Sequence, residues 1–128
     1  IVLNIDNDHL DYFRDLEHIK SAFQKYVALL PYDGLLVVNA DDANCLDLRS
    51  YTDAKVITYA IENDKANFIA RNIVFDDRGF AKFDVYYNRS YFSEIKLSVT
   101  GMHNVLNALA CIALCTQYGI NNKLIIKN

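Results

Sequence analysis

The chain carries two different hydrophobic patterns in succession, and their order restricts the fold more than any other feature. In the first 59 residues, short apolar runs alternate with segments of helical spacing; the runs are residues 1–5, 35–39 and 55–59. In residues 67–99, apolar and polar side chains alternate singly, as in half-buried antiparallel strands. The first pattern is typical of a parallel sheet with crossover helices. We therefore predict an α/β fold with a mainly parallel sheet, flanking helices and a small three-stranded antiparallel meander at residues 66–99.

Three segments are predicted to be helical. Residues 15–30 have apolar side chains every three or four positions, and Asp15 suits the N-terminal end of such a helix. Residues 41–48 form a shorter helix, and residues 103–118 form a longer one that ends at Gly119. The apolar residues of this last helix lie on more than one face, so we expect it to be buried between layers.

The composition indicates one globular domain or a large part of one, with 128 residues, 52% hydrophobic and 23% charged. No apolar run approaches the roughly 18 residues of a membrane-spanning helix, and no secretory leader is recognisable. A net charge of −3 argues against broad binding to nucleic acid. The chain opens on a strand-like run without a Met, so we expect a segment of a longer protein.

The three cysteines show no CxxC spacing and cannot all pair within the chain, which favours a reducing compartment, the cytoplasm. Cys111 and Cys115 fall on one face of the last predicted helix. We expect both to be buried as small hydrophobic residues.

The segment after the first apolar run is rich in potential metal ligands. Asp6, Asp8, His9 and Asp11 lie within six residues, directly after the carboxyl end of a buried strand. Ligands bind at this edge of open α/β sheets, and hard cations prefer oxygen ligands. The segment is therefore a candidate site for a divalent cation and, through it, a polyphosphate. The alternative is a solvated acidic loop, with Asp15 capping the next helix.

A second polar group lies at the start of the last predicted helix. Asn104 and Asn107 are three residues apart and share one helix face, and His103 precedes them. An amide both donates and accepts hydrogen bonds, which matches the mixed edge of a purine base. The alternative is that Gly101 is a turn residue, that His103 or Asn104 caps the helix, and that Asn107 is merely exposed.

Three motifs occur in an order that resembles a known family. They are NIDNDHLDYF at residues 4–13, NADD at residues 39–42 and SVTGMHNVLNALA at residues 98–110. Together they resemble the central domain of the Mur ligases, the ATP-dependent amino-acid ligases of peptidoglycan precursor synthesis. The resemblance covers nearly the whole chain, so it implies that residues 1–128 are the C-terminal part of that ATP-binding domain, with residues 66–99 as an antiparallel insertion.

The resemblance also implies roles for individual residues. His9 would bind the Mg²⁺ that bridges ATP phosphate and acyl-phosphate oxygens, with Asp8 and Asp11 shaping the loop around it. Asn104 and Asn107 would hold the adenine of ATP, and His103 lies in the same turn. No catalytic side chain is assigned within residues 1–128.

Within the family, the resemblance is strongest to the alanine-adding members, which join L-alanine to UDP-N-acetylmuramate. Members that add later residues have a carbamylated lysine on the helix after the DH motif, where this chain has Phe23 and Gln24. Lys25 comes into register after a shift of one residue, so the subfamily stays open on this point. The alternatives are a murein tripeptide ligase, a folylpolyglutamate synthase-like ligase and a non-catalytic nucleotide-binding α/β domain.

Parts that the family needs for activity are missing from these 128 residues. The glycine-rich GxxGK[ST] loop (P-loop) that cradles phosphates is absent, because the four glycines are widely scattered. The resemblance implies further a UDP-binding domain and a domain that brings the amino acid, and neither lies within residues 1–128. We therefore expect this segment to be inactive on its own.

Overall fold

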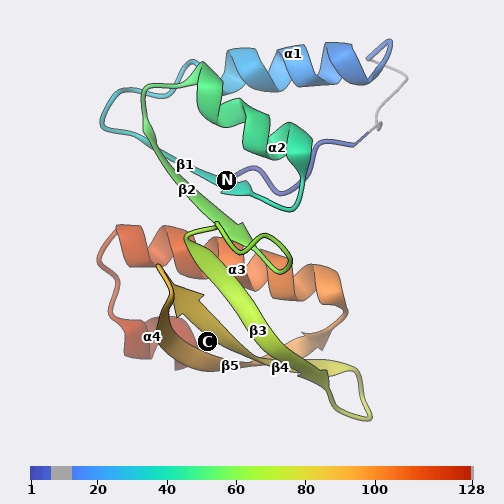
Figure 1. The fold of residues 1–128 in the computed structure, drawn as a ribbon, viewed down its shortest axis with the longest axis vertical. Helices are drawn as coiled ribbons and strands as arrows, with labels where there is room; N and C mark the ends of the chain where they lie inside the picture. Colours follow the sequence, from blue (N-terminus) through green and yellow to red (C-terminus); the bar gives the residue numbers. More distant parts are fainter. Residues whose placement is uncertain (7–12, 128) are drawn as a thin grey trace.

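The computed structural model describes residues 1–6 and 13–127. These residues form one sheet with helices on both of its faces (Figure 1). The helices are α1 (Leu16–Val27), α2 (Ala43–Asp47), α3 (Met102–Gln117) and α4 (Asn122–Lys127), with a 3-10 helix η1 (Leu48–Tyr51) after α2. The strands are β1 (Leu35–Asn39), β2 (Lys55–Ala60), β3 (Phe68–Phe75), β4 (Phe80–Tyr87) and β5 (Ser90–Thr100).

The five strands form one continuous sheet in the order β1-β2-β3-β4-β5. β1, β2 and β3 are parallel neighbours, and β3, β4 and β5 form an antiparallel meander. The predicted α/β class, with its parallel part and its meander, is confirmed. The predicted first strand is reduced to one parallel bridge between Val2 and Val38, although Val2 and Ile5 are both buried.

Successive residues of β1 contact different layers. Leu36 and Val38 pack in one core with Ile19 of α1 and Cys45 of α2, whereas Val37 belongs to a second core beneath α3. Because helices cover both faces of the sheet, the sequence of β1 is a nearly continuous run of apolar residues. Two separate buried clusters therefore pack against β1, one on each face of the sheet.

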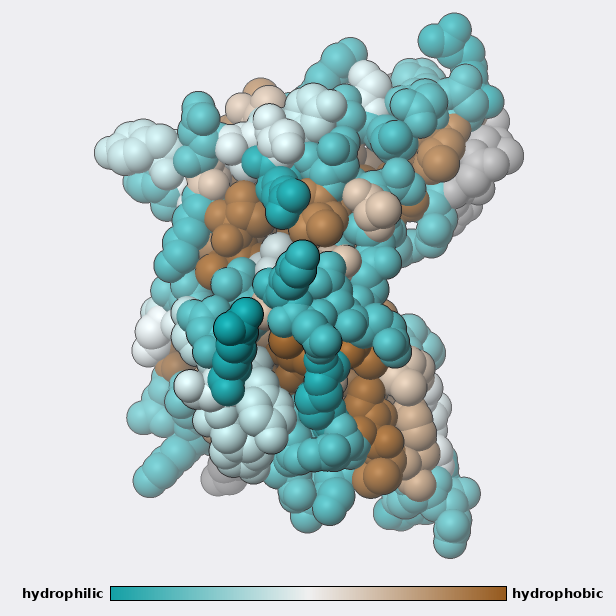
Figure 2. Space-filling model, in the orientation of Figure 1, coloured by the Kyte–Doolittle hydropathy of each residue, from teal (hydrophilic) through white to brown (hydrophobic). Residues whose placement is uncertain are grey.

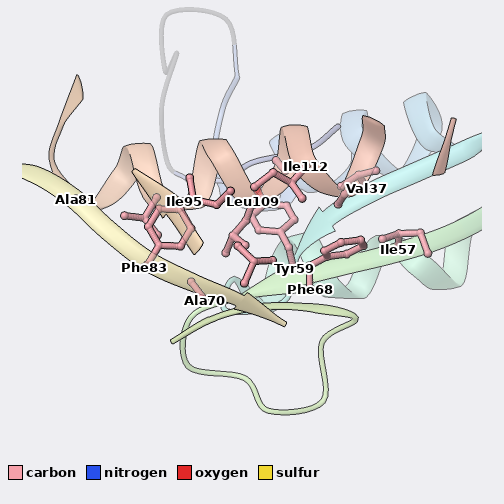
Figure 3. Packing of buried hydrophobic residues seen from close by; sticks show 14 residues of the cluster. Val37, Ile57, Tyr59, Phe68, Ala70, Ala81, Phe83, Ile95, Leu109 and Ile112 are labelled. Carbon is pink, nitrogen blue, oxygen red and sulfur yellow. The ribbon is translucent and has the colours of Figure 1, made fainter. Parts of the chain in front are cut away.

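The second core joins α3 to the parallel and the antiparallel parts of the sheet. Figure 3 shows Leu109 and Ile112 of α3 beside Tyr59, Phe68 and Phe83 of the strands. Tyr59 and Phe68 are also register partners across β2 and β3. α3 is therefore fixed on the sheet by apolar contacts that come from several strands.

The meander follows the alternation expected from its sequence. Ala81, Phe83 and Val85 of β4 are buried, whereas Lys82 between them is exposed. The turn between β4 and β5 consists of Asn88 and Arg89, which have φ angles of +47° and +68°. Two consecutive residues with positive φ are typical of the tight turns that match the twist of a hairpin.

The helices differ from the predictions mainly at their ends and in their burial. α1 begins after Asp15, whose carboxylate accepts a hydrogen bond from the His18 N–H at 2.8 Å, and it ends at Val27 rather than at residue 30. The expectation that Cys111 is buried is wrong, because α3 packs on the sheet with one face only and Cys111 lies on another. Cys115 is half-buried, and α4 was not predicted. None of the helices in the described ranges is long and apolar enough to cross a membrane.

Candidate functional site

Asp42, in the NADD motif, connects the opening segment of the chain to the end of β1. Its Oδ2 accepts a hydrogen bond from the Ile5 backbone N–H at 2.9 Å. Its Oδ1 caps α2 by accepting from the N–H groups of Asn44 and Cys45 at 2.8 and 3.0 Å. The Asn44 side-chain amide donates in turn to the Ile5 carbonyl at 3.3 Å. Both main-chain polar groups of Ile5 are thus held by residues at the start of α2.

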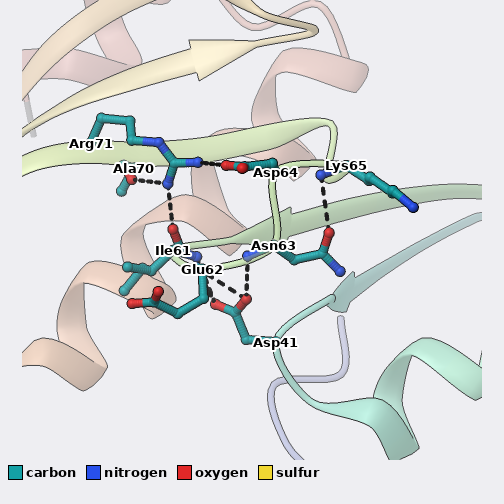
Figure 4. Close-up of polar contacts among 8 residues, drawn as sticks. All are labelled: Asp41, Ile61, Glu62, Asn63, Asp64, Lys65, Ala70 and Arg71. Carbon is teal, nitrogen blue, oxygen red and sulfur yellow. Dashed lines mark hydrogen bonds and ion pairs between the residues drawn. The ribbon is translucent and has the colours of Figure 1, made fainter.

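Asp41 makes the corresponding connection toward β2. Its carboxylate accepts hydrogen bonds from the backbone N–H groups of Ile61, Glu62 and Asn63, at distances between 2.6 and 3.2 Å (Figure 4). The side chain of Asn39, which is buried, accepts from the Asp41 N–H at 3.0 Å. The NADD motif therefore links the ends of three neighbouring segments at the carboxyl edge of the parallel strands.

The loop after β2 is fixed by further contacts. The Asn63 side-chain amide donates to the Ala40 carbonyl at 3.1 Å. Arg71 of β3 reaches back to the Asp64 carboxylate and to the Ile61 carbonyl (Figure 4). These structural roles were not predicted, because the sequence shows carboxylates and amides without showing which backbone groups need a partner.

The start of α3 places the predicted amides together. The Asn104 side-chain amide donates to the Thr100 carbonyl at 2.8 Å, and the Asn107 amide donates to Asn104 Oδ1 at 3.3 Å. Both asparagines are half-buried, and they share one helix face as predicted. Within the described residues, Asn107 Oδ1 accepts no hydrogen bond. This oxygen is therefore available to a hydrogen-bond donor of a ligand.

Gly101 occupies the N-cap position directly before α3. As a glycine it has no side chain that could cap the helix. Its φ angle is +94°, a region that favours glycine. A Cβ atom at this position would lie 2.7 Å from Cε1 of His103, so the imidazole lies directly against the glycine. The alternative in which His103 or Asn104 caps the helix is wrong, whereas Gly101 is a turn residue as expected.

The predicted metal ligands Asp8, His9 and Asp11 lie outside the described residues. In the part of the chain that is described, no three His, Cys, Asp or Glu side chains gather as a metal site. Asp6 is exposed and accepts a hydrogen bond from the Asn4 amide at 2.6 Å. The metal assignment therefore remains a prediction from the sequence.

The opening segment and the start of α3 lie on the same side of the molecule in the view of Figure 1, one in its upper and one in its lower half. Figure 2 shows the outline of the molecule indented between these halves, with hydrophobic side chains gathered in separate patches above and below. Between residues 1–6 and 101–107, which are both described, no hydrogen bond is formed. Within these two described ranges, the polar residues of the opening segment and those at the start of α3 are therefore held by separate sets of hydrogen bonds.

Two buried titratable groups lie near this edge of the sheet. Burial is the main cause that raises the pKa of the Cys45 thiol, and the charge of Asp42 adds to it. Burial also raises the pKa of the Tyr59 hydroxyl, which has no hydrogen-bond partner among the described residues. The raised pKa values keep the Cys45 thiol and the Tyr59 hydroxyl protonated at neutral pH.

Comparison with known proteins relates this architecture to one family. UDP-N-acetylmuramate–L-alanine ligase from Clostridium tetani is 46% identical over 127 residues, which are 99% of this chain and 27% of that protein. The structure of UDP-N-acetylmuramate-alanine ligase MurC from Thermotoga maritima is 30% identical with a TM-score of 0.74, and the match covers 98% of this chain and 27% of that one.

A third protein shares the fold at lower identity. MurF ligase from Thermotoga maritima, solved in complex with ADP, is 19% identical with a TM-score of 0.76, over 94% of this chain and 27% of that one. The chain thus spans about a quarter of the length of these relatives. The model of the Mur ligase middle domain matches residues 1–115, and the chain therefore belongs to the Mur ligase middle domain family.

Proposed function

We propose that this chain is part of a UDP-N-acetylmuramate–L-alanine ligase, a cytoplasmic enzyme of peptidoglycan precursor synthesis. The observation that carries the proposal is the 46% identity to the Clostridium tetani ligase, because the similarity extends over 99% of the chain. It therefore includes both the segment with His9 and the start of α3. Residues 1–128 would form the C-terminal part of the central domain, with residues 66–99 as its antiparallel insertion.

The start of α3 suits the adenine of ATP. Asn107 Oδ1 accepts no hydrogen bond from the described part of the chain and could accept one from the exocyclic amino group of adenine, while Asn104 holds the Asn107 amide in place. His103 is exposed in the same turn. The ADP complex of the related MurF ligase supports a nucleotide in this fold. We assign Asn104, Asn107 and His103 to nucleotide binding.

His9 would hold Mg²⁺, with Asp8 and Asp11 beside it. The carboxylate oxygens of Asp8 and Asp11 are of the kind that Mg²⁺ prefers, and the imidazole of His9 would add a nitrogen ligand. The bound ion would neutralise charge on phosphate oxygens. The segment that leads to these residues is anchored at the carboxyl edge of the sheet through Ile5.

The chemistry of such a ligase begins with a carboxylate, which is a poor acyl donor because its leaving group would be oxide. Transfer of the γ-phosphoryl group of ATP to the lactyl carboxylate gives an acyl phosphate. The amine of L-alanine attacks its carbonyl carbon, and the tetrahedral intermediate expels phosphate as the amide forms. In this scheme the residues of the present chain bind and orient the nucleotide, while the phosphate loop and the acceptor sites come from other parts of the enzyme.

The test is a ligation assay on the intact protein with ATP, Mg²⁺ and UDP-N-acetylmuramate. We expect L-alanine to be joined with release of ADP and phosphate, and we expect residues 1–128 alone to form no product. The same assay with murein tripeptide, or with a folate and glutamate, as competing substrates distinguishes the proposed ligase from the two alternative ligases. Preference for either would contradict the proposal, and ATP binding without any ligation would indicate a non-catalytic nucleotide-binding domain.

A further inference from the structure

We propose that Cys111 and Cys115 of α3 form a binding site for a soft monovalent cation, Cu(I), held between their two thiolates. Both cysteines are free thiols, Cys111 exposed and Cys115 half-buried. The third cysteine, Cys45, is buried on the other face of the sheet, in the core with Ile19, and takes no part. The site uses none of the residues assigned to nucleotide binding, so it does not depend on the proposed ligase activity.

The two cysteines border the same apolar groove, which lies between α3, α4 and β5. In Figure 1, α4 lies below the C-terminal end of α3. The groove has a volume of about 460 Å³, and its walls include Leu97 of β5 and Ile120. Among the described residues that line it, none is a carboxylate or an imidazole. Hard cations such as Mg²⁺ need oxygen ligands, so the donor atoms of this groove suit a soft ion instead.

The spacing of the two cysteines in a regular helix favours a bridging ion over a disulfide. Residues four apart point in directions about 40° apart around the helix axis, with about 5–6 Å between their Cβ atoms. A disulfide requires about 3.5–4.5 Å between Cβ atoms. Ile112 and Ala113, which lie between the two cysteines in sequence, are buried against the sheet. The helix cannot unwind here without exposing them, so the gap stays wide enough for one atom between the two sulfurs.

The number of ligands narrows the choice of ion. In residues 1–6 and 13–127, no three His, Cys, Asp or Glu side chains gather as a metal site. Structural Zn²⁺ takes four ligands, so two thiolates alone do not make a zinc site. Thiolates select Cu(I) among the soft ions, and this closed-shell ion is stable with two sulfur ligands in a line. Binding forms two S–Cu bonds and releases two thiol protons to the solvent, without a change of oxidation state.

The test measures Cu(I) binding to the intact protein, without oxygen and in competition with a coloured Cu(I) chelator. We expect the wild type to bind one Cu(I) that Cys111→Ser and Cys115→Ser each fail to retain, and bound Cu(I) should protect both thiols from alkylation. Each single variant should bind at least about a hundredfold more weakly, because the second S–Cu bond of the wild type forms within one molecule.

Ala108 offers matched controls, because it lies one turn before Cys111 and borders the same groove. Ala108→Cys combined with Cys111→Ala keeps the composition but places the thiols seven residues apart, about 10 Å along the helix axis. One ion cannot bridge this distance, so the variant should bind as weakly as Cys111→Ser. Ala108→Cys combined with Cys115→Ala places the thiols three residues apart, with about 5–6 Å between Cβ atoms, and should bind nearly as tightly as the wild type.

Equal affinity of the wild type and the seven-residue pair would overturn the inference, because each thiol would then hold an adventitious ion only. Wild-type affinity in either single variant would overturn it too. So would a Cys111–Cys115 disulfide that forms with a low-molecular-weight disulfide while the reduced protein takes up no Cu(I). If the variants with Ala108→Cys do not fold, Cys111→Ser decides, because this exposed position can be changed without opening the core.

Discussion

At the end of β1, the carboxylates of Asp41 and Asp42 bind backbone N–H groups of the chain itself, whereas at the start of α3 the amide oxygen of Asn107 accepts no hydrogen bond from the described residues. The first region uses its polar atoms to join neighbouring segments. The second leaves one polar atom available while apolar contacts hold the helix. Hydrogen-bond use therefore distinguishes polar residues that build the fold from those that are free to bind a ligand, even though both lie in equally conspicuous motifs.

Different kinds of contact hold the two regions in place. α2 has only five residues, so its position depends on the capping bonds of Asp42 and on a few buried side chains such as Cys45. α3 has 16 residues, and five of them are buried against the sheet. Substitutions of polar residues should therefore affect the fold at the first region and binding at the second.

The largest effect should come from the apolar anchor of α3. Leu109 is fully buried beside Tyr59 and Phe68. Leu109→Ala should lower the free energy of unfolding by about 2–5 kcal/mol, because it leaves a cavity between helix and sheet. Chemical denaturation measures this loss. Leu124→Ala, at an exposed position of α4, is the control and should change stability much less. Equal losses would show that apolar packing does not hold α3.

The next effect concerns the close contact at the start of α3. Gly101→Ala forces an alanine to φ near +94° and moves the His103 ring, which would lie 2.7 Å from the new Cβ atom. We expect a loss of about 1–3 kcal/mol from the backbone strain, because φ +94° with ψ +146° is a region essentially restricted to glycine, together with weaker ATP binding. Gly119→Ala has a positive φ but nothing within 4 Å. It should also cost some stability, because its φ is positive, but it should leave ATP binding unchanged; an equal change in ATP binding would contradict a role for the His103 contact.

A smaller effect should follow from loss of the free acceptor. Asn107→Ala in the intact enzyme should raise the KM for ATP about fivefold, because a single hydrogen bond is worth about 1 kcal/mol. Stability should change little, since the residue is half-buried and its side chain makes one hydrogen bond within the described ranges, to Asn104. Gln117→Ala, at the other end of α3, removes contacts to Lys55 and Tyr87 and should leave the KM for ATP unchanged. Kinetics and thermal unfolding of both variants test this separation.

The fold was largely predictable because local patterns and tertiary packing agree. β1 was predicted with its observed ends, and the alternation of Phe83 and Val85 placed the meander correctly. The predicted helix at residues 15–30 was too long, because its apolar spacing continues beyond Val27 into a turn. Cys111 was assigned to the interior because composition does not show which face of α3 remains uncovered.

The candidate site was predictable only in part, because hydrogen-bond partners depend on tertiary structure. The shared face of Asn104 and Asn107 follows from helical spacing alone. The bonds from Asp42 to Ile5 and from Asp41 to Ile61 join residues 37 and 20 positions apart, so no local pattern reveals them.

The smallest predicted effect tests whether a carboxylate far from the candidate site also serves the backbone. Asp76, in the turn before β4, accepts hydrogen bonds from the N–H groups of Phe80 and Arg78, each at 2.9 Å. The bond from Phe80 is the main cause that lowers the pKa of Asp76 below its ordinary value. A lowered pKa in the folded state means that the stabilisation is present above the ordinary pKa and is lost as the pH falls through the lowered one. The Phe80 amide should therefore exchange faster in strongly acidic solution than at neutral pH, after correction for intrinsic rates, as NMR can measure. Asp76→Asn keeps an acceptor without the charge and should abolish this pH dependence; its persistence in that variant would show that another group controls the turn.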